Sequence, residues 1–204
     1  MIVDGGKFDW ANGKFPEFTT PDESYHGIVY KDYGAPAFII KARMQLMRDF
    51  GVLPSAQDAF LLDLGLQTLP VRMERHCQNA EKVAEFLEKH PKIESVNYPT
   101  LESNKYHALQ QKYLPKGASG VISFVVSGGR EQAAAFIDRL QLASNVTHVA
   151  DIRTLVLHPA SSTHRQLTDE QLAAAGVNPG MIRFSVGLEH IDDIIADLTQ
   201  ALGE

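Results

Sequence analysis

Two short apolar segments in the second half of the chain each lead into side chains that could bind a ligand. The first, residues 152–158, is rich in aliphatic residues and is stopped by Pro159. Proline removes a backbone donor and favours an extended conformation in the residue before it. The polar residues that follow include three hydroxyls: Ser161, Ser162, Thr163, His164 and Arg165. We predict a polar loop at this strand end.

The second segment, residues 181–188, has the alternation of a strand with one buried face. Side chains along a strand point to opposite faces in turn, so Ile182 and Phe184 share the core face and Arg183 lies on the other. A guanidinium in mid-strand offers a planar fork of donors that matches a carboxylate. Together, the two strand ends predict a carboxylate site built around Arg183.

Each of these features also has a purely structural interpretation, which the sequence leaves open. Arg183 could form an ion pair with a nearby acid such as Asp151, and the hydroxyls at 161–163 could satisfy their own loop backbone. The histidines near Asp151 do not have the spacing of a zinc motif, so we predict no metal site; they are His148, His158 and His164.

Two other motifs favour ordinary structural roles. Gly128-Gly129 precedes a helical pattern and could bind phosphate, but no fuller nucleotide-binding pattern surrounds it, which favours a turn. Cys77 lies in a helical pattern without a positioned base, and no Gly-x-Ser-x-Gly motif is present. The sequence therefore argues against a nucleophilic hydrolase.

Composition limits the setting and the partners of the protein. With 204 residues, of which 44% are hydrophobic, the chain can bury a substantial core. The net charge of −6 and the lack of a basic block argue against nucleic acid and against an anionic membrane as partners. No apolar run is long enough to span a bilayer. Cys77 is the single cysteine and cannot form an internal disulfide, so we expect a cytoplasmic protein.

The order of the predicted elements indicates an α/β fold after a helical first part. Residues 7–35 are rich in aromatics, Gly and Pro without a sustained period, which predicts an arm that packs on another body. The helical patterns that follow lie at 38–50, 56–66 and 69–90. The predicted strands, which alternate with helices, lie at 93–98, 120–127, 152–158 and 181–188.

From this order we predict three parts, with boundaries at residues 50 and 91. Residues 1–50 form the arm, and residues 51–91 form a helical connector that contains a long helix. Residues 92–204 form an α/β domain, a small sheet with helices mainly on one face.

Four motifs resemble those of the O-acetylhomoserine sulfhydrylases, which belong to the Cys/Met-metabolism group of pyridoxal-phosphate (PLP) enzymes. The motifs are Val3-Asp4-Gly5-Gly6-Lys7-Phe8-Asp9-Trp10, Pro21-Asp22-Glu23-Ser24-Tyr25-His26-Gly27, Leu157-His158-Pro159-Ala160-Ser161-Ser162-Thr163-His164 and Ile182-Arg183-Phe184-Ser185-Val186-Gly187-Leu188-Glu189-His190-Ile191-Asp192-Asp193. The likeness runs nearly end to end. It implies the aspartate-aminotransferase-like architecture of fold type I PLP enzymes, with this chain as its carboxy-terminal half. Residues 1–50 would then include a remnant of the large cofactor domain, and 92–204 would be the small domain.

The resemblance also implies what this chain lacks. The family's Schiff-base lysine lies in a Ser-x-Thr-Lys context upstream of the Val-Asp-Gly-Gly motif, and no lysine here has that context. We therefore expect PLP as the cofactor of the whole enzyme but no catalytic and no cofactor-binding residue in this chain. The expected partner is the lysine-bearing amino-terminal half or a second copy in a homo-oligomer, and the chain alone is expected to be inactive.

Carried over by motif, the resemblance predicts three substrate-binding residues. Arg183 stands where the family binds the α-carboxylate of its amino-acid substrate, and Thr163 stands in the loop that lines the same pocket. His148 belongs to the segment His148-Val149-Ala150-Asp151, where relatives have Asn or Ser and then Gly. The departures at His148 and Ala150 bear on how closely the substrate can approach the backbone there.

The activity implied is the replacement of the acetate of O-acetylhomoserine by sulfide or a thiol, which gives homocysteine or methionine. Arg183 would orient the amino acid for this reaction. Two alternatives stay open. One is a non-catalytic module that binds an amino-acid carboxylate through Arg183 and regulates another process. The other is an interaction subunit that docks on full-length relatives through its aromatic arm.

Overall fold

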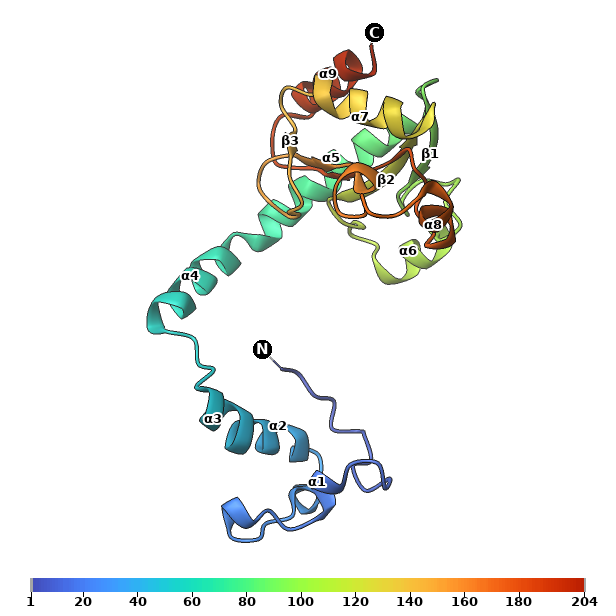
Figure 1. Cartoon of the computed structure of the whole chain (residues 1–204). Helices are drawn as coiled ribbons and strands as arrows, with labels where there is room; N and C mark the ends of the chain where they lie inside the picture. The colour runs from blue at the N-terminus through green and yellow to red at the C-terminus, as the bar shows by residue number, and fades with distance from the viewer. Residues whose placement is uncertain (1, 204) are drawn as a thin grey trace. The chain divides into compact units, whose positions relative to one another are not determined.

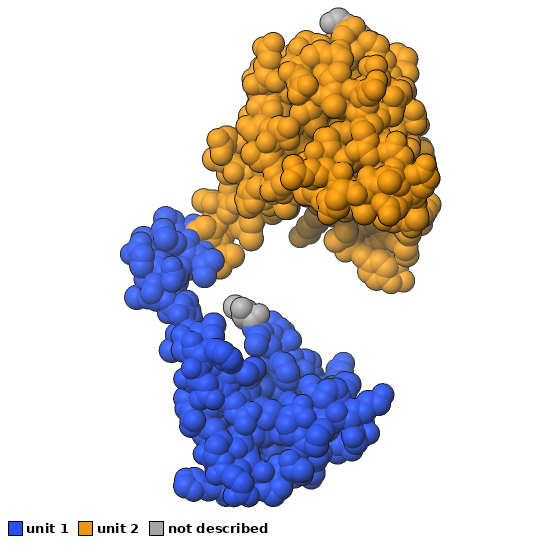
Figure 2. Space-filling model, viewed as in Figure 1, with its two compact units in different colours: residues 1–64 blue, residues 65–204 orange. Residues whose placement is uncertain are grey.

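The computed structural model describes residues 2–203 of the chain. It contains two compact units, residues 1–64 and residues 65–204, which Figure 2 colours separately. The boundaries predicted from the sequence, at residues 50 and 91, stay a prediction. Within the described range, no helix is long and apolar enough to cross a membrane.

An aromatic cluster organises the first unit. The Trp10 ring stacks on the rings of Phe18 and Phe38, with centroids 4.2 and 5.4 Å apart, and Phe15 meets Trp10 edge-on. Phe18 and Tyr30 are buried in this cluster. The expectation that the arm packs on another body is wrong for these rings, because tight turns bring them together within the unit.

The helices of the first unit are short up to residue 36 and then form one longer run. In chain order they are α1 (Pro16–Thr19), the 3₁₀ turns η1 (Glu23–Tyr25) and η2 (Tyr30–Tyr33), α2 (Ala37–Lys41), the π-helical segment η3 (Ala42–Met47) and α3 (Arg48–Phe50). Gly51, at φ 64°, ends this run in the left-handed conformation. The helix predicted at 38–50 is thus confirmed to within one residue.

Helix α4 (Ala56–Gln67) follows and has a reciprocal cap at its start. The Ser55 hydroxyl accepts a hydrogen bond from the Asp58 N–H at 3.1 Å, and the Asp58 carboxylate accepts from the Ser55 N–H at 3.1 Å. The cap satisfies backbone donors that the first turn of a helix leaves unpaired. It explains why this helix begins where the sequence predicts.

The second unit alternates helices and strands, as predicted (Figure 1). Its elements are α5 (Leu69–Glu88), β1 (Ile93–Asn97), α6 (His107–Tyr113), β2 (Val121–Val126), α7 (Gly129–Arg139), β3 (Ser144–Asn145), β4 (Leu155–Leu157), the 3₁₀ turn η4 (Pro159–Ser161), α8 (Asp169–Ala174), β5 (Met181–Ser185) and α9 (Ile191–Leu202). Helix α8 begins with a capping box between Thr168 and Gln171.

The strands form one mixed sheet of five strands in the order β1-β2-β5-β4-β3. Neighbours are antiparallel except β3 and β4, which are parallel. Strand β5 therefore has a partner on each side: Arg183 lies opposite Ser123 of β2 and opposite Leu157 of β4. This double pairing fixes the position of Arg183 in the sheet.

The core lies between one face of the sheet and helices α5, α7 and α9. Phe124 of β2 and Phe184 of β5 are buried there, and Phe136 of α7 meets Phe124 edge-on at 5.9 Å. The helix residues buried in the same cluster are Ala80, Val83, Ala84, Leu87, Ala133, Ile137, Ile194, Leu198, Ala201 and Leu202. The predicted α/β class, with helices mainly on one face, is confirmed.

The strand predicted at 152–158 is shorter than expected. Strand β4 begins only at Leu155, because Ile152 is 58% exposed and Arg153 lies in a turn closed by the Asp151 carboxylate. Strand β3 was not predicted. Its two residues have no apolar alternation and are placed by pairing with β4 alone.

Candidate functional site

Arg183 projects from β5 toward the face of the sheet that the helices do not cover. Its neighbours Ile182 and Phe184 are buried in the core, so alternation directs the half-buried Arg183 side chain the other way. The Arg183 Nη2 donates to the carbonyl oxygens of Thr147 and His148, at 2.6 and 3.2 Å. Its Nε and Nη1 make no hydrogen bond to a residue that the structure describes. These N–H groups remain able to donate to a carboxylate.

The ion pair between Arg183 and Asp151 that the sequence left open is not formed. Asp151 accepts a hydrogen bond from the Arg153 N–H at 3.0 Å, and its carboxylate lies 3.5 Å from the Arg153 Nε. The backbone hydrogen bond from Arg153, helped by the Arg153 charge, holds the pKa of Asp151 below its ordinary value. Asp151 is thus engaged by Arg153, and among the described residues the guanidinium of Arg183 has no acidic partner.

Ser185 lies on the same face of β5 as Arg183 and anchors the segment that Arg183 contacts. It is buried, and its hydroxyl accepts a hydrogen bond from the Ala150 N–H at 3.0 Å. Ala150 has φ 62°, in the left-handed region that favours glycine. At Ala150 the sequence therefore departs from the family pattern at a position whose backbone conformation favours glycine. His148, the other departure, is exposed and gives Arg183 its main-chain carbonyl.

The hydroxyls nearest β4 are used by their own loop. The Ser161 Oγ lies 2.9 Å from the His158 Nδ1, and the Ser162 Oγ donates to the His158 carbonyl at 2.6 Å. His158 is buried, and its Nε2 donates to the Pro179 carbonyl at 2.7 Å. Burial lowers the pKa of His158. The structural interpretation of Ser161 and Ser162 is therefore confirmed.

Thr163 lies further along the loop and is exposed. Its Oγ1 is 2.9 Å from the His164 Nδ1, and no hydrogen bond among the described residues joins it to Arg183. The structure thus brings Arg183 and His148 into contact. The role of Thr163 in the same site stays a prediction.

A buried polar network that was not predicted holds the end of β5. The Glu189 carboxylate accepts hydrogen bonds from the Thr154 N–H at 2.7 Å and from the Thr154 hydroxyl at 2.9 Å. The same hydroxyl accepts from the Gly187 N–H at 2.9 Å. Because Thr154 precedes β4 and Gly187 follows β5, this network ties β4 to β5, the strand that carries Arg183.

Helix α5 contributes to the same network through two buried side chains. The His76 Nδ1 donates to the Val186 carbonyl at 2.6 Å, and the Asn79 amide donates to the carbonyls of Gly187 and Glu189, each at 3.0 Å. Both residues follow the spacing of the buried stripe of α5, so helical periodicity was the signal that could have found them. Arg183 is thus held by a strand anchored at its far end to α5.

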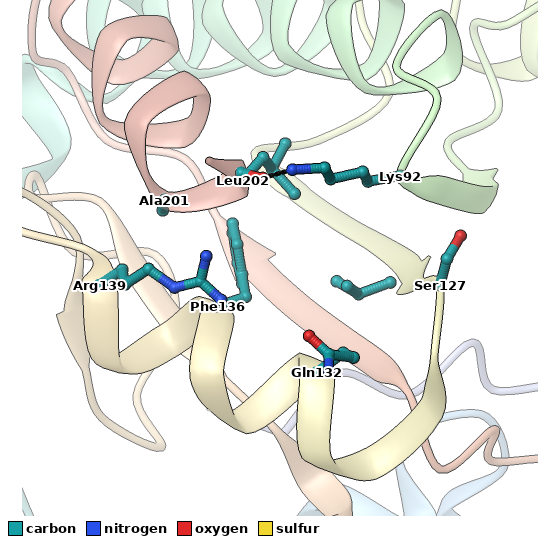
Figure 3. A pocket seen from close by; sticks show the side chains of 8 residues that line it. Lys92, Ser127, Gln132, Phe136, Arg139, Ala201 and Leu202 are labelled. Carbon is teal, nitrogen blue, oxygen red and sulfur yellow. Dashed lines mark hydrogen bonds between the residues drawn. The ribbon is translucent and has the colours of Figure 1, made fainter. Parts of the chain in front are cut away.

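A cavity of about 140 Å³ lies on the helix side of the sheet, beside α7 and α9 (Figure 3). It is lined by Lys92, Val126, Ser127, Gln132, Phe136, Arg139, Ala201 and Leu202. The Lys92 amine donates to the carbonyls of Leu202 and Gly203, at the carboxyl end of α9, where a cation is favoured. This lysine therefore caps a helix, and the cavity does not include Arg183.

Comparison with known proteins decides the family. A family model described as Cys/Met metabolism PLP-dependent enzyme matches residues 26–203 of the chain. This chain belongs to that family. The resemblance seen in its motifs is thereby confirmed.

Members of the Cys/Met metabolism family match this chain almost end to end. The O-acetyl-L-homoserine sulfhydrylase of Leptospira meyeri is 50% identical over 212 residues, which cover 99% of this chain and 48% of the relative. The homocysteine synthase of Schizosaccharomyces pombe is 49% identical, with the same coverage of 99% and 48%. The chain therefore spans about half the length of the curated relatives it matches.

A solved structure from Campylobacter jejuni, described as a candidate O-acetylhomoserine (thiol)-lyase with a pyridoxyl-lysine monophosphate residue, has a similar fold. It matches with a TM-score of 0.85 and 46% identity, over 95% of this chain and 46% of that chain. The predicted architecture, part of a PLP-dependent fold of this family, is confirmed.

The surroundings of Arg183 do not by themselves fit PLP. The contacts of its guanidinium are main-chain carbonyls, and no described lysine forms a hydrogen bond with it or with the segment it contacts. Lys92 is engaged by α9 on the other side of the sheet. The part of the site that these residues form is suited to a carboxylate.

Proposed function

We propose that this chain is the substrate-carboxylate half of a cytoplasmic PLP-dependent O-acetylhomoserine sulfhydrylase. The whole enzyme replaces the acetate of O-acetylhomoserine by sulfide or a thiol and yields homocysteine or methionine. Membership of the Cys/Met metabolism family and the 49–50% identity to relatives with these names support the proposal. Because the chain spans about half of each relative, its partner is the lysine-bearing amino-terminal half of the fold.

The observation that carries the substrate role is the state of the Arg183 guanidinium. It is half-buried, it has no acidic partner among the described residues, and its Nε and Nη1 are without protein acceptors there. In the proposed function these N–H groups hold the α-carboxylate of the amino acid. The hydrogen bonds from Nη2 to the carbonyls of Thr147 and His148 keep the guanidinium in place. Holding the carboxylate orients the reacting carbons of the substrate.

Thr163 and His148 are proposed as further contacts of the same amino acid. Both are exposed, so both are accessible to a small molecule. His148 supports the proposal more directly, because its carbonyl already positions Arg183. Substrate contact by the His148 ring or by the Thr163 hydroxyl would add to the affinity that Arg183 provides.

Reconstitution tests the proposed function. The chain is co-expressed with the amino-terminal half of the Leptospira meyeri relative, supplied with PLP, and assayed for sulfide-dependent formation of homocysteine from O-acetylhomoserine. We expect activity from the pair, and neither activity nor a borohydride-reducible lysine adduct from the chain alone. An active chain alone would contradict the proposal. So would an inactive pair under conditions in which the intact relative works.

A further inference from the structure

Residues 147–150, whose carbonyls contact Arg183, form a segment that lies outside the backbone pairing of the sheet. Pairing with β4 ends at the Val146 N–H, which donates to the Val156 carbonyl at 3.1 Å. Among the described residues, no backbone–backbone hydrogen bond involves residues 147–150. All four residues are exposed. A segment of this kind has little stability of its own, so side chains must hold it in place.

Two side chains of β5 attach this segment to the sheet. The Arg183 Nη2 donates to the carbonyls of Thr147 and His148, at 2.6 and 3.2 Å. The Ser185 hydroxyl accepts a hydrogen bond from the Ala150 N–H at 3.0 Å. Because Arg183 and Ser185 are two residues apart, they share one face of the strand. The segment is therefore attached at two points, one of which is the guanidinium itself.

Of these two attachment points, Ser185 is the rigid one. Its backbone pairs with Val121 of β2 and with Leu155 of β4, so the sheet holds it on both sides. Its side chain is short, and the residue is only 2% exposed. Arg183 is half-buried, and a long side chain such as arginine loses much rotational freedom when it is fixed. Ser185 therefore determines where the carbonyls of the segment lie, and these carbonyls determine where the guanidinium lies.

The backbone of Ala150 makes the segment depend on this hydrogen bond. Ala150 has φ 62°, which is unfavourable for a residue with a Cβ. Such a conformation persists only where the surrounding structure holds it. The Ser185 hydroxyl is the acceptor of the Ala150 N–H among the described residues. Without that acceptor, we expect Ala150 to relax to a negative φ and to displace the carbonyls of Thr147 and His148.

We propose that Ser185 is a positioning residue for the guanidinium of Arg183. Its hydroxyl holds residues 147–150, whose carbonyls engage Nη2 and leave Nε and Nη1 to the substrate α-carboxylate. The inference rests on the function proposed above and adds a residue that acts on the substrate only through Arg183. A guanidinium that is held in place beforehand loses less freedom when the carboxylate binds, and this raises the affinity.

The affinities of the reconstituted enzyme for O-acetylhomoserine and for its neutral carboxamide test this role. One neutral hydrogen bond contributes about a factor of five to an equilibrium, so Ser185→Ala should bind the acid about 5-fold more weakly. Its affinity for the carboxamide should change by less than about 2-fold. Ser185→Cys fills the same space with a weak acceptor and should behave as Ser185→Ala does.

Ser123→Ala is the matched control. Ser123 lies opposite Arg183 on β2, and its hydroxyl accepts a hydrogen bond from Asn97 at 3.4 Å but none from residues 147–150 within the described range. This variant removes the same atoms beside Arg183 without releasing the segment. Its affinity for either ligand should therefore change by less than about 2-fold.

A double-mutant cycle with Arg183→Met shows whether Ser185 acts through the guanidinium. In the Arg183→Met background, Ser185→Ala should change the affinity for the acid by less than about 2-fold. A residue that only stabilises the fold would weaken binding of both ligands, or would weaken binding of the acid equally in both backgrounds. Either result would overturn the proposal.

Amide exchange in the chain alone tests the first link. The Ala150 amide should exchange faster in Ser185→Ala than in the wild type, while the amides of β2 exchange equally; equal rates at Ala150 would overturn the inference. Binding of the acid that depends on Ser185 and Arg183 but yields no homocysteine would refute the proposed function and leave the inference standing. Homocysteine formation with an unchanged affinity in Ser185→Ala would overturn the inference and leave the proposed function standing.

Discussion

Replacing Asn79 by alanine tests how firmly α5 holds the strand that carries Arg183. Asn79 is 4% exposed, and its amide donates to the carbonyls of Gly187 and Glu189, each at 3.0 Å. The substitution leaves both carbonyls without this donor in a site that water reaches poorly. Because each lost hydrogen bond costs about 1 kcal/mol, we expect Asn79→Ala to lower the free energy of unfolding by about 2 kcal/mol.

Urea denaturation followed by circular dichroism measures this loss. Fluorescence is unsuitable, because Trp10 is the single tryptophan and lies in the first unit. With a slope of about 2 kcal/mol per molar urea, the midpoint should fall by about 1 M. Gln78→Ala is the matched control, since Gln78 is exposed and its amide donates, among the described residues, a hydrogen bond to Glu74 alone, at 3.2 Å. Its effect should stay within about 0.5 kcal/mol. Equal midpoint shifts in the two variants would refute the bracing role of Asn79.

Three further predictions concern the surroundings of the proposed site. Ala150→Gly should raise the free energy of unfolding by about 1 kcal/mol, because Ala150 has φ 62°, which glycine adopts without strain. Ala173→Gly, inside helix α8, should lower the free energy of unfolding by about as much. Urea midpoints that shift in the same direction in both variants would contradict this reasoning. Gly187→Ala should destabilise by at least about 2 kcal/mol, because a Cβ there would meet the Glu189 carboxylate and lie 2.5 Å from the Thr154 nitrogen; an unchanged urea midpoint would contradict it. Burial lowers the pKa of His158 below its ordinary value of 6.5. The neutral His158 ring therefore contributes its full stabilisation above pH 6.5, and this stabilisation is lost as the pH falls through the folded-state pKa. The urea midpoints at pH 7 and pH 5 should therefore differ less in His158→Gln than in the wild type. An identical difference in both proteins would contradict the conclusion that protonation of His158 destabilises the fold.

The sequence predicts those parts of the fold that a single local pattern determines. Helix α4 begins at its Ser55 cap, and the residues of β2 alternate as a strand with one covered face should. The π-helical segment η3 and the two-residue β3 could not be predicted, because neither has a local signature. Strand β3 exists through its pairing with β4, and that pairing depends on tertiary structure.

The same distinction applies to the candidate site. Alternation along β5 was enough to place Arg183 on the face opposite the core. Its contacts with the carbonyls of Thr147 and His148 could not be foreseen, because the loop that carries them is held by Ser185 through a long-range hydrogen bond. Asn79 was missed for another reason. Its place in the helical period indicated burial, but its buried partners lie over 100 residues away in the sequence.

Substrate affinity in the reconstituted enzyme tests the role of Arg183 most directly. The dissociation constant of O-acetylhomoserine is compared with that of its carboxamide analogue, for the wild type and for Arg183→Met. Charge-assisted hydrogen bonds to a carboxylate are worth about 2 kcal/mol, so the variant should bind the acid about 30-fold more weakly. Its affinity for the neutral carboxamide should change by less than about 3-fold. An equal loss for both ligands, or no loss for the acid, would contradict the assignment of Arg183 as the carboxylate-binding residue.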